Sequence, residues 1–225
     1  VLREDITEKS LLMKIEHFNN DLKTHGIIVQ LPLPEHIDTH NIINAINPAK
    51  DVDGFHPANL GKLFIGIPGL VPCTALGCLK LIQGCEKNLA GKSALVVGRS
   101  NIVGKPIAAM LLQQSCTVTV AHSKTVNLAE LVAQADIVVA AVGVPGIIKG
   151  EWIKPGSIVI DVGITRINAG DGPNIAGDVE FKAALQRAKY ITPVPGGVGP
   201  MTVVCLMANT IKAACEQRLI EFEQE

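Results

Sequence analysis

The sequence ALVVGRSNIVGKP, residues 94–106, decides the fold of much of this chain. It combines a short apolar, β-branched run with a tight turn at Gly98, a second glycine at Gly104 and a helix start beside Pro106. This order of elements aims backbone N–H groups and the positive end of a helix at a diphosphate. Ser100 replaces the middle glycine of the usual G-x-G-x-x-G pattern, so an ordinary strand-to-helix turn stays open as the alternative to nucleotide binding.

The order of apolar and helical segments around this turn indicates a parallel sheet. Short apolar runs without alternation recur, and the stretches between them have the composition of helices. The expected strands are 93–98, 116–121, 136–143, 157–163 and 190–194, and the expected helices are 107–114, 127–134, 178–189 and 201 to about 221. Strands of this kind, covered by helices on both faces, predict an α/β fold with a doubly wound, Rossmann-like parallel sheet.

The residues after the second expected strand bear on which dinucleotide binds. An NAD site carries an Asp or Glu there, which accepts a hydrogen bond from the ribose 2′-hydroxyl. This chain has HSKT at 122–125 instead, with Arg99 in the first turn. Hydroxyls and cations suit a 2′-phosphate, so the sequence favours NADP over NAD. A solvated loop is the alternative interpretation.

Two further loops are expected at the same edge of the sheet. ITPVPGGVGPMT (191–202) places three glycines and three prolines between the last strand and the last helix, and DVGI (161–164) ends the strand before it. A rigid loop with few side chains lets the backbone approach a ligand closely. A structural hinge has the same composition and remains the alternative.

Before residue 72 the pattern changes, and we expect a second, smaller α/β domain there. Helical spacing predicts a helix from Thr7 to Lys23, capped by Thr7 and stopped by Gly26. A buried strand at Ile27–Leu31 and helices over 38–46 and 75–87 are also predicted. The segments 50–64 and 66–74 are rich in Gly and Pro and are typical of loops.

The composition excludes several classes of function. The chain has 225 residues, a net charge of -1 and only 3% aromatic residues, so we expect neither a basic field nor a stacking platform for nucleic acid. Its six cysteines include no C-x-x-C pair, which favours reduced thiols over a disulfide framework. The best membrane candidate, 201–214, is shorter than the roughly 18 residues of a spanning helix, and the start of the chain lacks a signal-peptide layout.

A metal site is not expected either. Residues 51–54 (DVDG) resemble the start of a calcium loop, but the twelfth position is Lys62 rather than Glu. His36 and His40 lie four residues apart with no third ligand in view. Asp51 and Asp53 therefore either lie in a solvated turn or supply a ligand-facing carboxylate.

Seven segments taken together are similar to one enzyme family, and they cover the chain from about Gly26 onward. They are GIIVQLPLP (26–34), KDVDGFH (50–56), PCTALG (72–77), VVGRSNIVGKP (96–106), AHSKT (121–125), IVIDVGI (158–164) and YITPVPGGVGPMT (190–202). On these motifs the chain resembles the bifunctional methylenetetrahydrofolate dehydrogenase/methenyltetrahydrofolate cyclohydrolase family. The motif PVPGGVGPMT is highly specific.

The resemblance implies NADP-dependent oxidation of 5,10-methylenetetrahydrofolate to the 5,10-methenyl form, then hydrolysis to 10-formyltetrahydrofolate. This is one-carbon metabolism serving purine, methionine and histidine biosynthesis. It implies a folate-binding catalytic domain, residues 1–72 completed by a helix at 203–225, packed on an NADP domain, residues 73–202, with the active site in the cleft between them. A homodimer through the nucleotide domain is also implied. The lack of a signal-peptide layout predicts a cytoplasmic location, with organellar targeting left open.

Individual residues take roles from the same resemblance. Gln30 matches the glutamine that supports a catalytic lysine, and Asp53 matches the carboxylate that grips the pterin ring. Pro195 and Gly196 fall where the family's loop borders the folate. The expected cofactor-binding residues are Gly98, Arg99, Ser100 and Gly104 around the phosphates, Ser123 near the 2′-phosphate, and Ile164 and Thr202 near the nicotinamide half.

The chain departs from the family pattern at two points. Ala75 stands where the family usually carries Pro, which alters a turn. The family's Tyr-x-x-x-Lys motif, which holds the catalytic lysine, has no counterpart upstream of GIIVQLPLP, because the only tyrosine is Tyr190. We expect the chain to start after that segment, so that its folate domain is N-terminally incomplete. The alternatives are a truncated gene product, a non-catalytic folate- or dinucleotide-binding relative, and a different NADP dehydrogenase on the same nucleotide domain.

Overall fold

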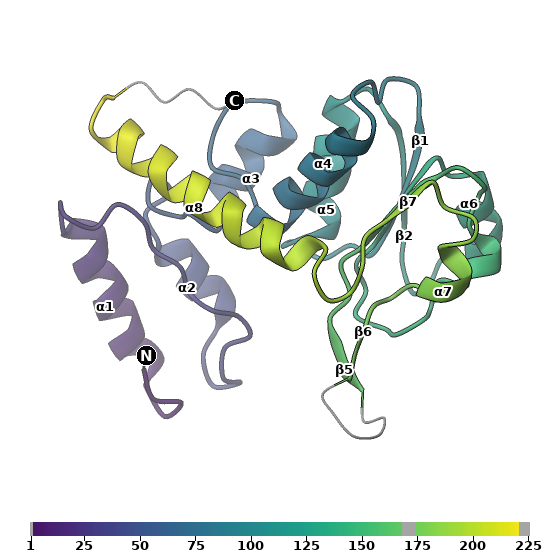
Figure 1. The fold of residues 1–225 in the computed structure, drawn as a ribbon. Helices are drawn as coiled ribbons and strands as arrows, with labels where there is room; N and C mark the ends of the chain where they lie inside the picture. Colours follow the sequence, from purple (N-terminus) through teal and green to yellow (C-terminus); the bar gives the residue numbers. More distant parts are fainter. Residues whose placement is uncertain (1, 168–173, 221–225) are drawn as a thin grey trace. The chain divides into compact units, whose positions relative to one another are not determined.

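The chain divides into two compact units in a computed structural model that describes residues 2–167 and 174–220 (Figure 1). Unit 1 comprises residues 1–73 and 206–225, and unit 2 comprises residues 74–205. Helix α8 (Val198–Gln217) contributes its first residues to unit 2 and the remainder to unit 1.

Unit 2 is built on a five-stranded parallel sheet with the strand order β2-β1-β3-β4-β7. Its strands are β1 (Ser93–Val97), β2 (Thr117–Ala121), β3 (Ile137–Ala140), β4 (Ile158–Asp161) and β7 (Tyr190–Ile191). The winding of the chain reverses between β1 and β3, as in a doubly wound fold. The fold class expected from the sequence is therefore confirmed.

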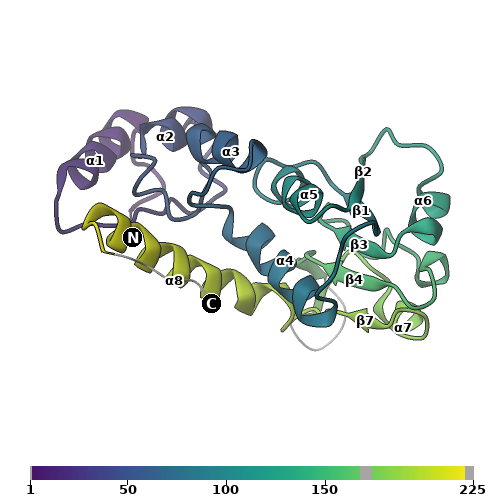
Figure 2. The same ribbon diagram turned by 90° about the horizontal axis from the view of Figure 1, so that it is seen from above.

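Helices cover both faces of this sheet. Helix α5 (Gly104–Gln113) packs against β1 and β2, and α6 (Leu128–Gln134) lies on the opposite side (Figure 2). The second face is closed by a cluster that includes Leu95 and Val138 from the strands and Val132 from α6. Burying each such side chain contributes about 1.5–3 kcal/mol. The remaining helices of this unit are α4 (Cys73–Cys85), η1 (Gly150–Trp152) and α7 (Phe181–Ala184).

Three features of unit 2 differ from the prediction. An antiparallel hairpin, β5 (Thr165–Ile167) with β6 (Asn174–Ala176), was not expected. The helix expected over 178–189 is reduced to α7, because hydrogen bonds to Asp161 and a bridge from Val179 to Ile148 keep its first residues extended. Helix α8 begins three residues before Met201, and its expected end near Glu221 lies outside the described residues.

Unit 1 is mainly helical, with α1 (Glu8–Asn20), α2 (Thr39–Ala45) and α3 (Pro57–Phe64). Thr7 caps α1, as predicted, by accepting a hydrogen bond from the Ser10 amide. Asp38 caps α2 in the same way through the amide of His40. The helices enclose a small aliphatic core of Leu11, Ile15, Ile27, Ile37, Ile42 and Ile46.

The predicted strand at Ile27–Leu31 was wrong. Only Ile27 forms a bridge, to Asp51, and no ladder continues from it among the described residues. Helix α1 ends well before Gly26, because the Asp21 carboxylate instead accepts hydrogen bonds from the amide of Lys23 and the hydroxyl of Thr24.

Helix α3 lies in a segment that was expected to be a loop. His56 Nδ1 accepts a hydrogen bond from the Ala58 amide, and Pro57 occupies the first helical position, where its missing N–H costs nothing. Pro57 therefore marks a helix start rather than a loop.

Helix α8 is longer than the apolar segment expected from the sequence, and its length and composition alone would suffice to cross a membrane. The core helices of soluble proteins pass the same test. Its polar residues bind unit 1: Asn209 donates hydrogen bonds to the carbonyls of Val52 and Val71, and Lys212 donates one to the carbonyl of Gly69. These contacts pack the C-terminal part of α8 within unit 1.

Candidate active site

The loops predicted to bind a dinucleotide meet at one edge of the unit 2 sheet. All five strands are parallel, so their carboxyl ends lie together. The turn after β1 and the loop after β3 flank the point where the winding reverses, which is where open α/β sheets bind ligands.

Two glycines shape the turn after β1. Gly98 has a φ of +124°, and a side chain there would overlap the carbonyl oxygen of Ala141. A side chain at Gly104 would overlap the carbonyl oxygen of Gly98. Both positions therefore need glycine, because the turn packs directly on itself and on the chain leaving β3. The result is a compact turn that leads straight into α5.

Polar side chains of the same turn are available to a phosphate. Ser100 Oγ accepts hydrogen bonds from the amides of Val103 and Gly104, both at 3.2 Å, which leaves its hydroxyl hydrogen to be donated. Arg99 is exposed, and within the described part of the chain it forms no ion pair. This arrangement fits a diphosphate and a nearby second phosphate.

The turn after β2 lies beside it, because β1 and β2 are paired in register. The amide of His122 donates a hydrogen bond to Thr125 Oγ1 at 2.8 Å, and the amide of Lys124 donates one to His122 Nδ1 at 3.2 Å. The turn is thus closed by its own side chains, and it leaves Ser123 and Lys124 exposed. No carboxylate stands in this turn to repel a 2′-phosphate.

The other expected cofactor residues follow β4 and β7. Ile164 is 64% exposed. Thr202 lies one turn into α8, and its hydroxyl donates to Thr74 Oγ1 and to the Val198 carbonyl. Pro195 and Gly196 are exposed on the loop before α8, and Gly196 has a φ of +102°.

In unit 1 the expected folate residue Asp53 lies on a turn held by its neighbour Asp51. The Asp51 side chain accepts hydrogen bonds from the amides of Gly54, Phe55 and His56 at 2.8–3.2 Å, and from the side-chain amide of Asn59 at 2.9 Å. It is 1% exposed, so these bonds are shielded from water.

Lys50 fixes the start of this turn. Its ammonium donates hydrogen bonds to the carbonyls of Phe18, Asn19 and Asp21 at the end of α1. A cation at a helix C-terminus stabilises the helix as well as satisfying its last carbonyls. The 50–56 turn is therefore rigid before any ligand binds.

Asp53 itself is half-buried and lies in a shallow depression lined by apolar side chains such as Ile46 and Phe55. Burial, together with the nearby Asp51 carboxylate, raises the pKa of Asp53 to about 6. No described residue donates a hydrogen bond to its carboxylate. Asp53 is thus a poorly solvated acceptor that a ligand's N–H groups can satisfy.

Gln30 follows Val29, which lines the Asp53 depression, and Gln30 itself borders a groove of about 730 Å³ between α1 and the segment 27–37. Its side chain is exposed and donates a hydrogen bond to the carbonyl of Leu31 at 3.1 Å. Gln30 is therefore exposed on unit 1, and in the described part of the chain no hydrogen bond joins it to Asp53.

Comparisons with known proteins agree with this arrangement. Residues 72–218 match the tetrahydrofolate dehydrogenase/cyclohydrolase NAD(P)-binding domain, and residues 1–53 match the catalytic domain of the same group. The chain belongs to the tetrahydrofolate dehydrogenase/cyclohydrolase family. This membership confirms the resemblance, the NADP cofactor and the dehydrogenase and cyclohydrolase activities expected from the sequence.

Individual members of the tetrahydrofolate dehydrogenase/cyclohydrolase family are closely similar. The bifunctional protein FolD of Paramagnetospirillum magneticum is 58% identical over 213 residues, which are 94% of this chain and 72% of that protein. The FolD structure from Campylobacter jejuni has a TM-score of 0.92 at 47% identity, covering 96% of this chain and 76% of that one. FolD from Trypanosoma brucei, solved with NADP and an inhibitor, has a TM-score of 0.93 at 42% identity, covering 96% and 75%.

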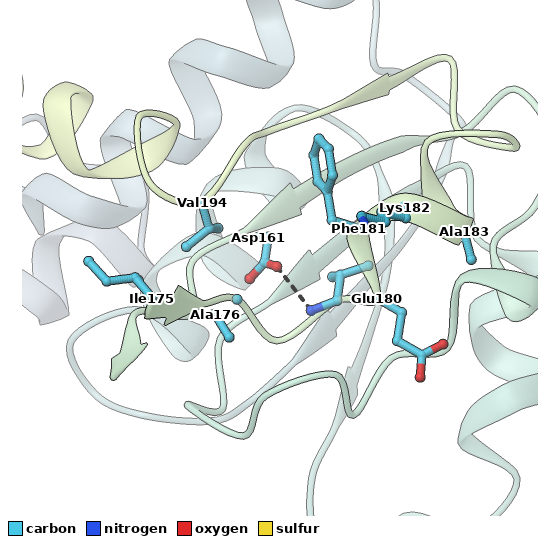
Figure 3. A pocket seen from close by; sticks show the side chains of 10 residues that line it. Asp161, Ile175, Ala176, Glu180, Phe181, Lys182, Ala183 and Val194 are labelled. Carbon is cyan, nitrogen blue, oxygen red and sulfur yellow. Dashed lines mark hydrogen bonds between the residues drawn. The ribbon is translucent and has the colours of Figure 1, made fainter. Parts of the chain in front are cut away.

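The sequence analysis did not identify two buried acids of unit 2, Asp161 and Asp178. Asp161 is 3% exposed and Asp178 is fully buried. Asp161 lines a pocket of about 470 Å³ beside β6 and α7, where Figure 3 shows it among apolar side chains such as Ile175 and Val194. None of the predicted site residues lines this pocket. An Asp directly after a fully apolar strand, as in IVID, is the signal that could have identified Asp161 as buried.

Among the described residues, no cluster of three metal-ligating side chains occurs. All six cysteines are free, and four of them are buried, as expected for thiols that pack as small apolar groups.

Proposed function

We propose that the chain carries out the family's two reactions with Asp53 orienting the pterin and with NADP bound along the carboxyl edge of the unit 2 sheet. This assignment rests on the half-buried Asp53 carboxylate. It is held on a rigid turn, and no described residue donates a hydrogen bond to it. Pterin amino and ring N–H groups supply the donors that it lacks. Residues 1–72 and 203–225 would then form the folate domain, and residues 73–202 the NADP domain.

The oxidation needs little from the protein beyond position. A methylene carbon between two nitrogens loses hydride readily, because a nitrogen lone pair stabilises the resulting cation. NADP, when bound, accepts that hydride. The residues of this chain therefore act by holding the substrate beside the cofactor, which is the contribution of proximity to catalysis. In this proposal Asp53 holds the pterin, while Pro195 and Gly196 border the folate.

The hydrolysis adds water to the methenyl carbon and requires a proton to be moved. Gln30 is proposed to support the lysine that assists this transfer in the family. Its exposed amide is consistent with a partner outside the described contacts. Gln30→Ala should then lower the rate of hydrolysis and leave NADP affinity unchanged.

For the cofactor, we propose that Ser100 and Arg99 bind the phosphates and that Ser123 faces the 2′-phosphate. Gly98 and Gly104 let the backbone approach the diphosphate, and Ile164 and Thr202 lie beside the nicotinamide half. The exposed, carboxylate-free turn after β2 supports the choice of NADP.

A homodimer through the nucleotide unit is a further proposal. Strand β2 is the edge of the sheet, and its residues Thr117, Thr119 and Val120 are exposed. An unpaired edge of this kind is a surface on which a second copy can pair. Light scattering should find a dimer, and Val120→Lys should shift it toward the monomer; a monomeric unsubstituted chain would contradict this proposal.

The chain's place in metabolism follows from its product. 10-Formyltetrahydrofolate is an activated one-carbon donor, so we propose a cytoplasmic enzyme that supplies purine, methionine and histidine biosynthesis.

The decisive experiment for the catalytic function, made on the full-length protein that includes this chain, is an assay of NADPH formation from 5,10-methylenetetrahydrofolate, followed by an assay of 10-formyltetrahydrofolate. Both products are expected. Binding of folate and NADP without turnover would instead favour the non-catalytic relative, which the missing Tyr-x-x-x-Lys motif suggests. Unchanged folate affinity in Asp53→Ala would favour a different dehydrogenase on this nucleotide unit.

A further inference from the structure

A buried carboxylate at the carboxyl edge of the unit 2 sheet takes no part in the function described so far. Asp178 is 0% exposed. Its Oδ2 accepts hydrogen bonds from the amides of Val142 at 2.7 Å and Gly143 at 3.0 Å. These are the residues that carry the chain away from the end of β3, so one side chain fixes two successive backbone groups there.

The backbone of Asp178 is held in turn by Asp161 at the end of β4. Asp161 Oδ1 accepts hydrogen bonds from the amides of Asp178 and Gly163, both at 2.9 Å. Its Oδ2 accepts one from the amide of Val179, also at 2.9 Å, and Figure 3 shows Asp161 reaching toward this segment. The two aspartates therefore join the chain leaving β3 to the chain leaving β4.

The backbone packs closely around the Asp178 and Asp161 carboxylates. A side chain at Gly163 would overlap Asp178 Oδ1, and one at Gly177 would overlap the Asp161 carboxylate. No ion pair to Asp178 occurs among the described residues, and its Oδ1 has no hydrogen-bond partner there. A carboxylate buried without a cation lowers the stability of the folded state, and the fold nevertheless retains one at this position.

The segment that Asp178 holds supports the phosphate turn. Gly98 lies so close to the Ala141 carbonyl that a side chain would not fit between them. Any shift of the chain at 141–143 therefore displaces the turn after β1. The adenosine end of the cofactor would lie away from this contact, over β2, where Ser123 stands.

We propose that Asp178 is a positioning residue for NADP, which fixes the backbone beneath the diphosphate and the nicotinamide half of the cofactor. This inference rests on the proposed placement of NADP along the same edge. It makes a prediction that a purely structural role does not make: removing the Asp178 contacts weakens binding of the whole dinucleotide more than binding of its adenosine end.

The test is calorimetric titration of the chain with NADP and, separately, with adenosine 2′,5′-bisphosphate, a fragment that occupies only the β2 end. In Asp178→Ala we expect the dissociation constant for NADP to rise about tenfold or more, because two hydrogen bonds to a charged acceptor are lost. The constant for the fragment should change by less than about threefold. Asp178→Asn keeps an oxygen that can accept both amides, so it should restore NADP binding.

Equal weakening of NADP and fragment in Asp178→Ala, or unchanged NADP binding, would overturn the inference. If the unsubstituted chain does not bind the fragment, the cofactor placement fails, and the inference fails with it. If Asp178→Ala does not fold, amide hydrogen exchange of the unsubstituted chain tests whether Asp178 holds the backbone after β3. Val142 and Gly143 should exchange slowly without cofactor, and fast exchange at both would contradict a role for Asp178 in holding them.

Discussion

Two turns present the proposed ligand-binding residues, and they are made rigid in opposite ways. The turn at 50–56 in unit 1 is held by charged side chains, because Asp51 accepts three backbone amides and Lys50 donates to three carbonyls. The turn at 98–104 in unit 2 is held by close packing around Gly98 and Gly104. Loss of a single hydrogen-bond acceptor should therefore destabilise the first turn, and gain of a single methyl group should destabilise the second.

The largest effect is expected at Asp51. Asp51→Ala leaves the partly buried amides of Phe55 and His56 without an acceptor, and leaves the Gly54 amide only the backbone carbonyl of residue 51, which should lower the free energy of unfolding by about 2–4 kcal/mol. Urea denaturation measures this loss. Asp38→Ala is the matched control, because Asp38 also accepts backbone amides but is exposed, and it should cost about 1 kcal/mol. Similar losses for the two variants would show that burial of Asp51 is unimportant.

In the second turn, Gly98→Ala should lower the free energy of unfolding by about 2–3 kcal/mol and weaken NADP binding about tenfold, because its methyl group meets the Ala141 carbonyl. Gly91→Ala is the control: Gly91 also has a positive φ, of +77°, but no atom lies within 4 Å of an added methyl group. It should cost about 1 kcal/mol and leave NADP binding unchanged. Normal NADP affinity in Gly98→Ala would contradict the proposed role of this turn.

A smaller effect is expected from the pKa of Asp53, which is raised from 3.8 to about 6 in the folded chain. Between these pH values the folded chain retains a proton that the unfolded chain has released. The free energy of unfolding should therefore fall as the pH rises through this window and then level off. Asp53→Asn should remove that dependence, gaining about 1–2 kcal/mol at neutral pH once solvent screening of the partly exposed group is allowed for.

The same titration should affect ligand binding with the opposite sign. The ionised carboxylate is the better acceptor for pterin N–H groups, so folate affinity should rise about tenfold between about pH 5 and about pH 7. Fluorescence titration across this range measures the effect. A folate affinity that does not change with pH would mean that Asp53 does not bind the pterin.

The smallest predicted change is in cofactor choice. Ser123→Asp places a carboxylate beside the 2′-phosphate and should shift the ratio of NADP to NAD affinity about tenfold toward NAD. Gln134→Asp is the control, because it adds the same charge at an exposed position at the end of α6 and should leave the ratio unchanged. An unchanged ratio in Ser123→Asp would remove Ser123 from the cofactor site.

The sequence predicted unit 2, the proposed NADP domain, more accurately than unit 1, for a physical reason. The central strands β1, β3 and β4 are buried on both faces, so their apolar runs identify them without knowledge of their neighbours. Ile27–Leu31 has a similar composition but only one bridging partner, and pairing of that kind depends on residues distant in sequence.

The candidate site shows the same limit. Gly98, Gly104 and Ser123 follow from local pattern, because a tight turn between strand and helix has its own composition. Asp51, Asp161 and Asp178 were not predicted as buried acceptors, since each is satisfied by amides that only the folded chain brings near it. The Pro and Gly of α3 were misinterpreted because a helix start and a loop use the same residues.

The central claim is that Asp53 in one unit and the glycine turn in the other serve a single reaction. Its most direct test is NADPH formation from 5,10-methylenetetrahydrofolate by the chain and by Asp53→Ala, with NADP affinity measured in parallel. We predict that the unsubstituted chain forms NADPH, and that Asp53→Ala loses this activity while binding NADP normally. Undiminished NADPH formation by Asp53→Ala, or none by the unsubstituted chain, would contradict the account.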